Sequence, residues 1–368
     1  MSENTAIETQ GVKYAGSKLK ILPHILKLIR PLPVNRVFDG FSGTTRVAQA
    51  LAQQGYEVIA NDIAVWPYWF GQCYLMNTRP AAYYEPLIRR LNTLPGKSGW
   101  FTQHYGGEDR NGAAVQPDGT KRPWLKHNTR KLDAIRKEID ALWLPKAEKG
   151  VLLTSLILAL DRVDSTLGHQ ASYLREWAPR ARKTMLLEVP RLIPRTARHR
   201  VFRKDIFDLA GGVEADLAYY DPPYGSNNEK MPPSRVRYAS YYHLWTTVCL
   251  NDRPRLFGKA HRRADTGDLV AGSVFESYQR GRSGRFVAVE ALERLIRQTR
   301  SRFILLSYSS GGRATAEELM AVLDSRGSIA KVVQVDYQRN VMAAMRWTHD
   351  WVRDSDAPHR EFLFLLEQ

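Results

Sequence analysis

Short apolar runs alternate with amphipathic stretches in two separate parts of the chain, and this alternation predicts a sheet covered by helices. In the first part, residues 19–29 and 46–54 are expected to form helices, and residues 36–38 and 58–60 are expected to form strands. In the second part, the expected strands are 201–205, 217–220, 303–306, 329–335 and 361–366, and the expected helices are 288–299 and 315–323. Thr315 and Glu318 form a capping-box pattern at the start of the last helix. The fold class is therefore α/β.

The region between these two parts lacks the alternation. Residues 64–76 are rich in aromatic side chains and are expected to pack as a helix on the sheet, whereas the polar, Gly- and Pro-containing residues 93–122 indicate loops. Further helices are expected at 128–142 and 149–162, and a polar, Arg-rich loop region beside the site at 251–285. We expect three segments: a first part of the α/β domain at 1–79, an inserted region at 80–200, and a second part of the domain at 201–368.

Positive charge is concentrated in the inserted region. The formal net charge of the 368 residues is +16, and residues 121–204 hold 20 Lys and Arg against 8 Asp and Glu. A surplus this concentrated favours a polyanionic partner over an ordinary solvated face. Aromatic residues lie among these cations, a mixture that suits a phosphate backbone with its bases. The candidate DNA contacts are Arg175, Arg180, Arg182, Lys183, Arg195, Arg198 and Arg200.

Cysteine content and apolar runs indicate the cellular setting. Cys73 and Cys249 are far apart and form no zinc-ligand pattern, so we expect a reducing compartment, no disulfide framework and no metal site. Residues 1–10 lack the apolar core of a signal peptide, and the longest apolar run, 151–160, is too short to span a bilayer. We expect a soluble cytoplasmic protein that does not associate with a membrane.

Two loops in the first part are candidates for ligand binding. Lys13-Tyr14-Ala15-Gly16-Ser17-Lys18 allows close backbone approach, and Lys18 can reach a carboxylate or phosphate. Asp39-Gly40-Phe41-Ser42-Gly43-Thr44-Thr45 joins a strand to a helix, as in a nucleotide-binding sheet, although it is not the G-x-G-x-x-G of dinucleotide sites. Asp62 closes the next strand, where it can accept hydrogen bonds from ribose hydroxyls. Helix capping is the alternative role for Asp39 and Asp62.

Asp221-Pro222-Pro223-Tyr224 follows an apolar run and should stand where a buried strand ends. The two prolines fix φ twice and remove two N–H donors, which makes a stiff corner with free acceptors. The Asp221 carboxylate and the Pro222 carbonyl can accept hydrogen bonds from one planar amino group, and the Tyr224 ring can lie against a flat heterocycle. This corner therefore suits the exocyclic amine of a base. The alternative is an ordinary turn with a surface tyrosine.

Taken together, these motifs resemble those of the Dam-like DNA adenine-N6 methyltransferases, the alpha group or D12 class. Residues 13–18 resemble the family's cofactor loop, K-W-A-G-G-K, and residues 39–44 its D-x-F-x-G-x-G turn. Two departures are Tyr14 in place of Trp and Thr44-Thr45 where a second Gly is common. The resemblance implies S-adenosylmethionine as cofactor, bound by Tyr14, Ala15, Gly16, Lys18, Asp39, Gly40, Phe41, Ser42, Gly43, Thr44, Asp62, Asp205, Ile206 and Asp221.

The same resemblance implies a fold and an activity. The fold is a Rossmann-like methyltransferase sheet, mostly parallel with an antiparallel last strand, interrupted by a largely helical target-recognition region. The activity is site-specific transfer of a methyl group to the amino group of an adenine flipped out of duplex DNA, with Asp221, Pro222, Pro223 and Tyr224 as the catalytic residues. The implied partners are double-stranded DNA and a cognate restriction endonuclease, for a monomeric enzyme encoded by a bacterium or a phage.

Other functions fit the residues less well. An RNA base is an alternative substrate, because a positive surface does not distinguish RNA from DNA. Cytosine-N4 methyltransferases more commonly carry S-P-P-Y, and protein-glutamine methyltransferases typically carry Asn at the position of Asp221. A DNA-binding protein with an inactive methyltransferase domain is disfavoured because Asp39, Asp62 and Asp221 are all present.

Overall fold

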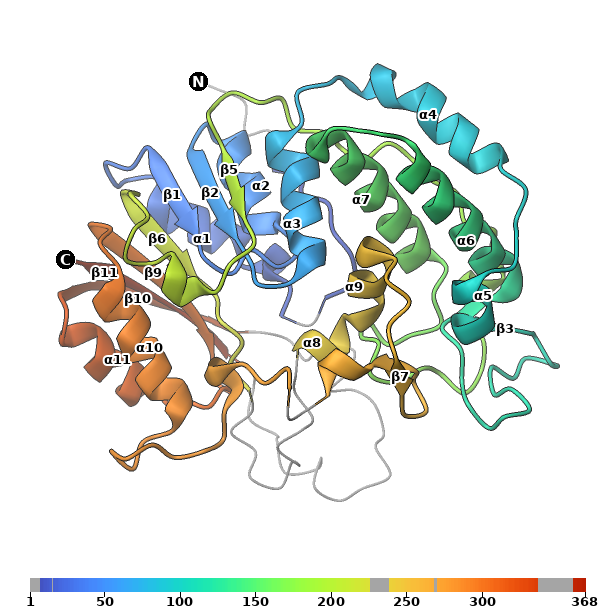
Figure 1. Ribbon diagram of the computed structural model, residues 1–368. Coiled ribbons are helices and arrows are strands. Elements are labelled where there is room, and N and C mark those ends of the chain that lie inside the picture. The colour runs from blue at the N-terminus through green and yellow to red at the C-terminus, as the bar shows by residue number, and fades with distance from the viewer. Residues whose placement is uncertain (1–6, 15, 226–237, 268–269, 337–359) are drawn as a thin grey trace.

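A mixed seven-stranded sheet forms one half of the computed structural model, which describes residues 7–14, 16–225, 238–267, 270–336 and 360–368 (Figure 1). Its order is β10-β11-β9-β6-β1-β2-β5. β11 runs antiparallel to both of its neighbours, and the other pairings are parallel, as predicted. The strands are β1 (Arg36–Asp39), β2 (Glu57–Asn61), β5 (Arg200–Phe202), β6 (Leu217–Tyr220), β9 (Phe303–Ser309), β10 (Ser328–Asp336) and β11 (Arg360–Glu367).

Helices cover both faces of this sheet because side chains alternate along each central strand. In β6, Leu217 and Tyr219 face one apolar cluster, and Ala218 and Tyr220 face the other. The first cluster is completed by α1 (Leu22–Ile29) and α2 (Arg46–Gln53), the second by α10 (Val287–Gln298) and α11 (Ala316–Asp324). The Thr315–Glu318 capping box begins α11 as predicted.

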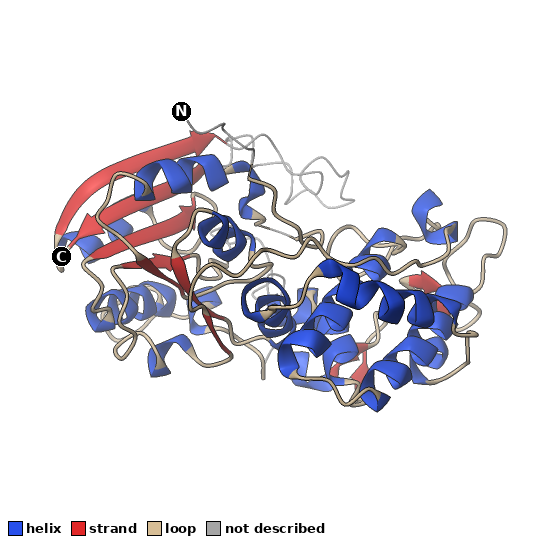
Figure 2. Cartoon of the chain, turned by 90° about the horizontal axis from the view of Figure 1, so that it is seen from above, coloured by secondary structure: helices blue, strands red, loops and turns tan. Residues whose placement is uncertain are grey.

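A third apolar cluster forms a largely helical half beside the sheet, and Figure 2 shows it at the other end of the molecule from most of the strands. Its central helix, α7, is buried along most of its length. The helical half also takes in α9, which follows the Asp221 corner in sequence. Its helices are α3 (Val65–Gly71), the π-helical turn η2 (Gln72–Met76), α4 (Ala81–Thr93), α5 (Trp100–Tyr105), α6 (Lys126–Ala141), α7 (Lys146–Arg162), α8 (Tyr238–Tyr241) and α9 (His243–Leu250).

Two expected loop regions contain regular structure. Residues 93–122 include α5, so the loop prediction is wrong there; the Asp133 carboxylate accepts hydrogen bonds from the Gly99, Phe101 and Thr102 amides and caps this helix from a distance. Two short strand pairs complete the structure: β3 (Gly106–Gly107) with β4 (Trp124–Leu125), and β7 (Leu256–Phe257) with β8 (Arg262–Arg263). Within the described residues, no helix has the length and apolar character needed to cross a membrane.

Candidate active site

The carboxyl ends of three neighbouring strands bring the acidic motif residues together. Asp39 ends β1, Asp62 follows β2, and Asp221 follows β6. β1 pairs in parallel with the other two strands, so their carboxyl ends meet at one edge. A cavity of about 670 Å³ opens there. Thirteen of the predicted cofactor residues line it, and Ala15 lies outside the described residues; the thirteen are Tyr14, Gly16, Lys18, Asp39, Gly40, Phe41, Ser42, Gly43, Thr44, Asp62, Asp205, Ile206 and Asp221.

The turn after β1 brings its backbone close to this cavity. A Cβ on Gly40 would lie 2.7 Å from the Tyr220 ring, so no larger residue fits. Gly43 has a φ of 46°, a conformation that favours glycine, and its amide donates to Asp62 Oδ2 at 2.9 Å. Thr45, at one of the positions where the family commonly has a second glycine, is also left-handed, with a φ of 59°. Thr45 therefore adopts a conformation that glycine would adopt more readily.

Asp39 has an unsatisfied carboxylate. It is 1% exposed, and neither carboxylate oxygen has a hydrogen-bond partner among the described residues. Burial, followed by the negative charges of Asp221 and Asp62, holds its pKa well above the ordinary value; the Phe41 and Ala48 amides offset part of the rise without making bonds of normal geometry. A buried charge without a partner is costly, and a cation in the cavity would relieve that cost. The ammonium group of S-adenosylmethionine fits this requirement.

Asp62 has the capping role that was the alternative for it, and it also lines the cavity. Its Oδ1 accepts from the Ala64 amide at 2.8 Å, so it caps the start of α3, and its Oδ2 holds the Gly43 amide. Burial raises the Asp62 pKa to about 6, although these amides oppose the rise. The carboxylate still lines the cavity, which leaves it in reach of ligand hydroxyls.

A stack of two aromatic rings and a guanidinium lies beside Asp205. Phe207 and Phe275 stack with ring centroids 5.6 Å apart and an interplanar angle of 15°. The Arg294 guanidinium lies over Phe207, 4.1 Å from its centroid. Asp205 accepts from the Phe207 amide at 3.0 Å and fixes the start of this turn. Phe275 and Arg294 were not predicted, and they line the same cavity as Asp205 and Phe207.

Four side chains form a buried charged group at the Asp221 corner. Lys18 Nζ lies 2.8 Å from both Asp221 Oδ1 and Glu361 Oε1, and it donates to the Tyr224 hydroxyl at 2.6 Å. Three acceptors match the three protons of an ammonium. Lys18 is therefore directed at Asp221 and Tyr224, whereas the sequence suggested that it contacts a ligand carboxylate or phosphate. Glu361 was missed, because its sequence signal is only a lone acid beside an apolar run.

Burial and charge act in opposite directions on this group. Burial raises the pKa of Asp221; Lys18 opposes this rise, and Glu361 adds to it. Burial by itself lowers the pKa of Lys18, but Asp221 and Glu361 outweigh it and hold the pKa well above the ordinary value. Lys18 is therefore a fixed cation beside a carboxylate that is easier to protonate than usual. Pro222 is buried behind the corner, and Pro223 lines the cavity.

Aromatic side chains form the wall opposite the acids. Tyr14 stacks on Tyr242 with centroids 4.6 Å apart and also contacts Trp66 and Tyr238. All four line the cavity. Tyr242 also belongs to the apolar cluster of the helical half, so it both lines the cavity and packs in the core. Tyr14 fills the position where Trp is usual in the family.

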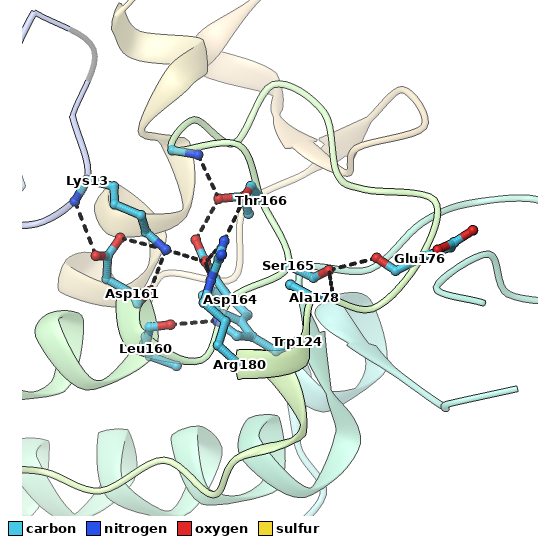
Figure 3. Close-up of polar contacts among 11 residues, drawn as sticks. Lys13, Trp124, Leu160, Asp161, Asp164, Ser165, Thr166, Glu176, Ala178 and Arg180 are labelled. Carbon is cyan, nitrogen blue, oxygen red and sulfur yellow. Dashed lines mark hydrogen bonds and ion pairs between the residues drawn. The ribbon is translucent and has the colours of Figure 1, made fainter. Parts of the chain in front are cut away.

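A partly buried ion network around Asp164 ties residue Lys13 to the helical half (Figure 3). Lys13 Nζ lies 2.5 Å from Asp164 Oδ1 and donates to the Asp161 carbonyl at 2.6 Å. Arg180 contacts the same Asp164 oxygen through two nitrogens, at 3.0 and 3.1 Å, and also donates to the Thr166 carbonyl. The Lys13 amide donates to Asp161, whose pKa burial raises to about 7. The network joins the residue before Tyr14 to the segment that follows α7.

The structure separates the predicted DNA contacts into three groups. Arg180 is engaged in the network around Asp164, whereas Arg175, Arg182 and Lys183 are exposed, and Arg182 is paired with Asp109. Arg195, Arg198 and Arg200 are exposed in the segment that leads into β5. Because β5 runs parallel to β2, its start lies toward the amino ends of the strands. In Figure 1 this segment is at the upper side, opposite the carboxyl end of β6.

A second hollow, of about 890 Å³, lies in the helical half. Arg110, Arg122, Lys126, Arg130 and Arg253 contribute cations to it, and Glu108 and Asp118 contribute acids. Figure 1 places the neighbouring α5 and β3 at the right-hand edge of the molecule, below α6, and β7 at its lower side. We call these five cations the cleft cations.

The mostly parallel sheet with its antiparallel β11, and the cavity at the carboxyl ends of its strands, are consistent with the Rossmann-like fold of methyltransferases. The sequence profile of the D12 class N6 adenine-specific DNA methyltransferases matches residues 14–264, and the chain belongs to this family, which uses S-adenosylmethionine as methyl donor and DNA as substrate.

Curated relatives are modification enzymes. The chain is 27% identical over 342 residues to modification methylase StsI of Streptococcus sanguinis. The matched region covers 89% of this chain and 48% of that protein, so the chain spans about half of that relative's length. It is 25% identical over 339 residues to type II methyltransferase M.NlaIII of Neisseria lactamica, with 89% of this chain and 92% of that protein covered. It is 24% identical over 336 residues to M.CviAII of Paramecium bursaria Chlorella virus 1, at 88% and 91% coverage.

Proposed function

We propose that this chain methylates the N6 amino group of adenine at a specific sequence in duplex DNA. The observation that carries the proposal is the Asp221-Pro222-Pro223-Tyr224 corner in a chain of this family: Asp221 and Pro223 line the same cavity as the predicted cofactor residues, and the Tyr224 hydroxyl contacts Asp221 and Lys18 beside it. The target base must leave the duplex, because the corner lies at a cavity that a stacked base pair cannot enter.

The cavity supplies groups for each part of S-adenosylmethionine. Asp39 would bind the ammonium of its methionine part, and Asp62 would accept hydrogen bonds from the ribose. Asp205 and the edges of the Phe207–Phe275 pair, which line the cavity, would hold the adenine ring. When bound, the cofactor supplies a methyl group made electrophilic by its sulfonium.

The corner would prepare the target nitrogen. The lone pair of an adenine amine is delocalised into the ring, so the nitrogen is a poor nucleophile. Asp221 and the Pro222 carbonyl would accept its two hydrogens, which favours a pyramidal nitrogen with a directed lone pair. Tyr224 would stack on the base, its hydroxyl held by Lys18. The methylated nitrogen is cationic and loses its proton readily.

We place the duplex along the side of the molecule that holds the carboxyl end of β6. Arg175, Arg182 and Lys183 are exposed candidates for phosphate contact, and the cleft cations extend the positive surface on that side. The segment with Arg195, Arg198 and Arg200 leads into the start of β5, at the amino ends of the strands, where it is poorly placed to contact the same duplex. Binding should weaken steeply with salt.

Two triple variants test this placement. Replacing Lys126, Arg130 and Arg253 with Ala should weaken binding to duplex DNA and reduce the dependence of log K on log salt by about 0.9 per lost phosphate contact. The matched control removes the same charge from Arg195, Arg198 and Arg200. Fluorescence anisotropy over a salt series measures both. An equal or larger loss for the control would place the DNA on the opposite side.

The names of the relatives support a biological setting. Because they are modification methylases, we propose that this chain protects DNA from a cognate restriction endonuclease, and that it acts as a monomer in the cytoplasm. DNA from cells that express this chain can be treated with a panel of restriction endonucleases. An endonuclease that fails to cut this DNA, but cuts DNA from control cells, would identify the sequence that the chain protects.

Methylome sequencing tests the activity itself. DNA from a methylation-free bacterial host that expresses this chain should gain N6-methyladenine at one sequence motif, and the same host with Asp221→Ala should not. A folded, cofactor-binding protein that leaves no mark on DNA would shift the substrate to RNA or indicate an inactive domain.

A further inference from the structure

Glu361 lies at the catalytic edge because β11 is antiparallel to its neighbours. The start of an antiparallel strand meets the carboxyl ends of the parallel ones, and Glu361 is the second residue of β11. It pairs with Ser309 of β9 and Val335 of β10, and its side chain is 8% exposed. A residue 140 positions after the corner in sequence is thereby brought beside it.

The contacts of Glu361 converge on one oxygen. Oε1 accepts from Ser307 Oγ at 2.7 Å and lies 2.8 Å from Lys18 Nζ. Ser307 is fully buried in β9, a central strand, so the carboxylate has a rigid support. Lys18, which is 6% exposed, lies between this carboxylate and Asp221.

Lys18 transmits this support to the catalytic corner. Its ammonium contacts Asp221 at Oδ1, and the Tyr224 hydroxyl reaches the same oxygen at 3.3 Å. Among the described residues, the contacts of the Asp221 carboxylate all fall on Oδ1, so Oδ2 remains for a ligand. An ammonium with only one carboxylate would be less firmly fixed, because a partly satisfied buried charge is costly.

We propose that Glu361 is a positioning residue for methyl transfer: it anchors Lys18, and through Lys18 it fixes the Asp221 carboxylate so that Oδ2 faces the target amino group. The proposal rests on the proposed function for the reaction, but the anchoring itself is independent of it. Glu361 acts through Lys18 and does not contact the substrate, so its effect must disappear when Lys18 is removed.

Three variants distinguish the anchoring of Lys18 by Glu361 from the negative charge of Glu361. Glu361→Ala removes the anchor, and we expect single-turnover methylation to slow by about 10- to 100-fold, the effect of small misplacements of reacting groups. Glu361→Gln keeps an acceptor for Lys18, and it should recover most of the rate. Glu367→Gln on the same strand is the control, because Glu367 pairs with Arg302 at the surface. Calorimetric affinity for S-adenosylmethionine should stay at the wild-type value in all three.

A double-mutant cycle with Lys18→Met tests the route of the effect. If Glu361 acts through Lys18, then Glu361→Ala combined with Lys18→Met should be no slower than Lys18→Met alone. Rate losses that multiply would overturn the proposal, and so would a wild-type rate for Glu361→Ala. A fall in cofactor affinity that matches the fall in rate would instead make Glu361 a structural residue.

A pH titration of the Asp221 carboxyl group without DNA tests the contact with Glu361 separately from the proposed methylation of DNA. Carbon-13 NMR of the Asp221 carboxyl carbon, assigned with Asp221→Ala, reports its protonation whether or not the chain methylates DNA. Because the Glu361 charge raises the Asp221 pKa, the midpoint should be lower in Glu361→Gln. An unchanged midpoint would overturn the contact. An inactive wild type with the shifted midpoint would reject the reaction and leave the contact established.

Discussion

The sheet half and the helical half use their charged residues in different ways. In the sheet half, Asp39, Asp62 and Asp221 each follow a strand and open into one cavity. In the helical half, cations of one dense tract have unrelated roles. Arg136 is 2% exposed and donates hydrogen bonds to the Val248 and Cys249 carbonyls at the end of α9, where the helix dipole stabilises a positive charge. Arg182, by contrast, lies at the surface. Charge density alone therefore does not identify function; position relative to a strand end does.

The largest effect should come from the sheet half. Asp221→Ala removes the acceptor for the target amine, and we expect the methylation rate to fall about a thousandfold, within the range for loss of one positioned group. Cofactor affinity should change little. Single-turnover incorporation of labelled methyl groups and calorimetry measure the two quantities.

Asp208→Ala is the matched control for this change, because Asp208 is an exposed acid near the same cavity. It should retain the wild-type rate. Equal losses in both variants would mean that net negative charge, and not the corner, supports the reaction.

Asp39→Asn should affect the cofactor more than the chemistry. The variant loses the charge that faces the ligand ammonium, so affinity for S-adenosylmethionine should weaken about 10- to 100-fold, equivalent to the about 1.5–3 kcal/mol of a hydrogen bond between charged groups. Isothermal calorimetry gives the constant. An unchanged affinity would contradict the role assigned to the unsatisfied carboxylate.

The same variant has a pH signature without ligand. The folded pKa of Asp39 is raised, so its contribution to stability is complete below its ordinary value of 3.8 and is lost as pH rises toward the folded pKa. The free energy of unfolding of Asp39→Asn minus that of wild type should therefore increase as pH rises above 3.8. Urea denaturation of the ligand-free proteins between pH 5 and 8 checks the sign.

Arg180 and Arg182 are two residues apart, but we expect Arg180→Ala to reduce mainly the stability of the fold and Arg182→Ala to reduce mainly DNA binding. Arg180→Ala deprives Asp164, whose side chain is 3% exposed, of one of its two cations, and should lower the free energy of unfolding by about 1–2 kcal/mol. Arg182→Ala breaks a surface pair with Asp109 and should cost about 0.5 kcal/mol or less, but it should weaken DNA binding. For both variants, urea denaturation measures the free energy of unfolding, and fluorescence anisotropy measures DNA binding. The reverse ranking would make Arg180 a surface contact.

Local patterns predicted the sheet half well because its signals are contained within a few residues. Asp39 and Asp221 could be placed from the apolar runs before them, and the capping box from Thr315 and Glu318. Contacts between distant residues could not be predicted. Lys18 and Glu361 are 343 positions apart, and Asp133 caps α5 from another helix. No periodic sequence pattern indicates either contact, because each partner is an ordinary charged residue in its local sequence.

A further effect on stability alone concerns Thr45, where the sheet half departs from its family. The left-handed φ of 59° favours glycine, yet the Thr45 hydroxyl donates to the Thr44 carbonyl and accepts from Gln49 Nε2 at 3.0 Å. Thr45→Ala loses the hydroxyl and keeps the strained Cβ, whereas Thr45→Gly loses both. Glycine should therefore be more stable than alanine by about 1 kcal/mol, the cost of a left-handed residue with a Cβ. Urea denaturation compares them. Alanine at least as stable as glycine would show that the turn relaxes, and that the threonine is held by its hydrogen bonds alone.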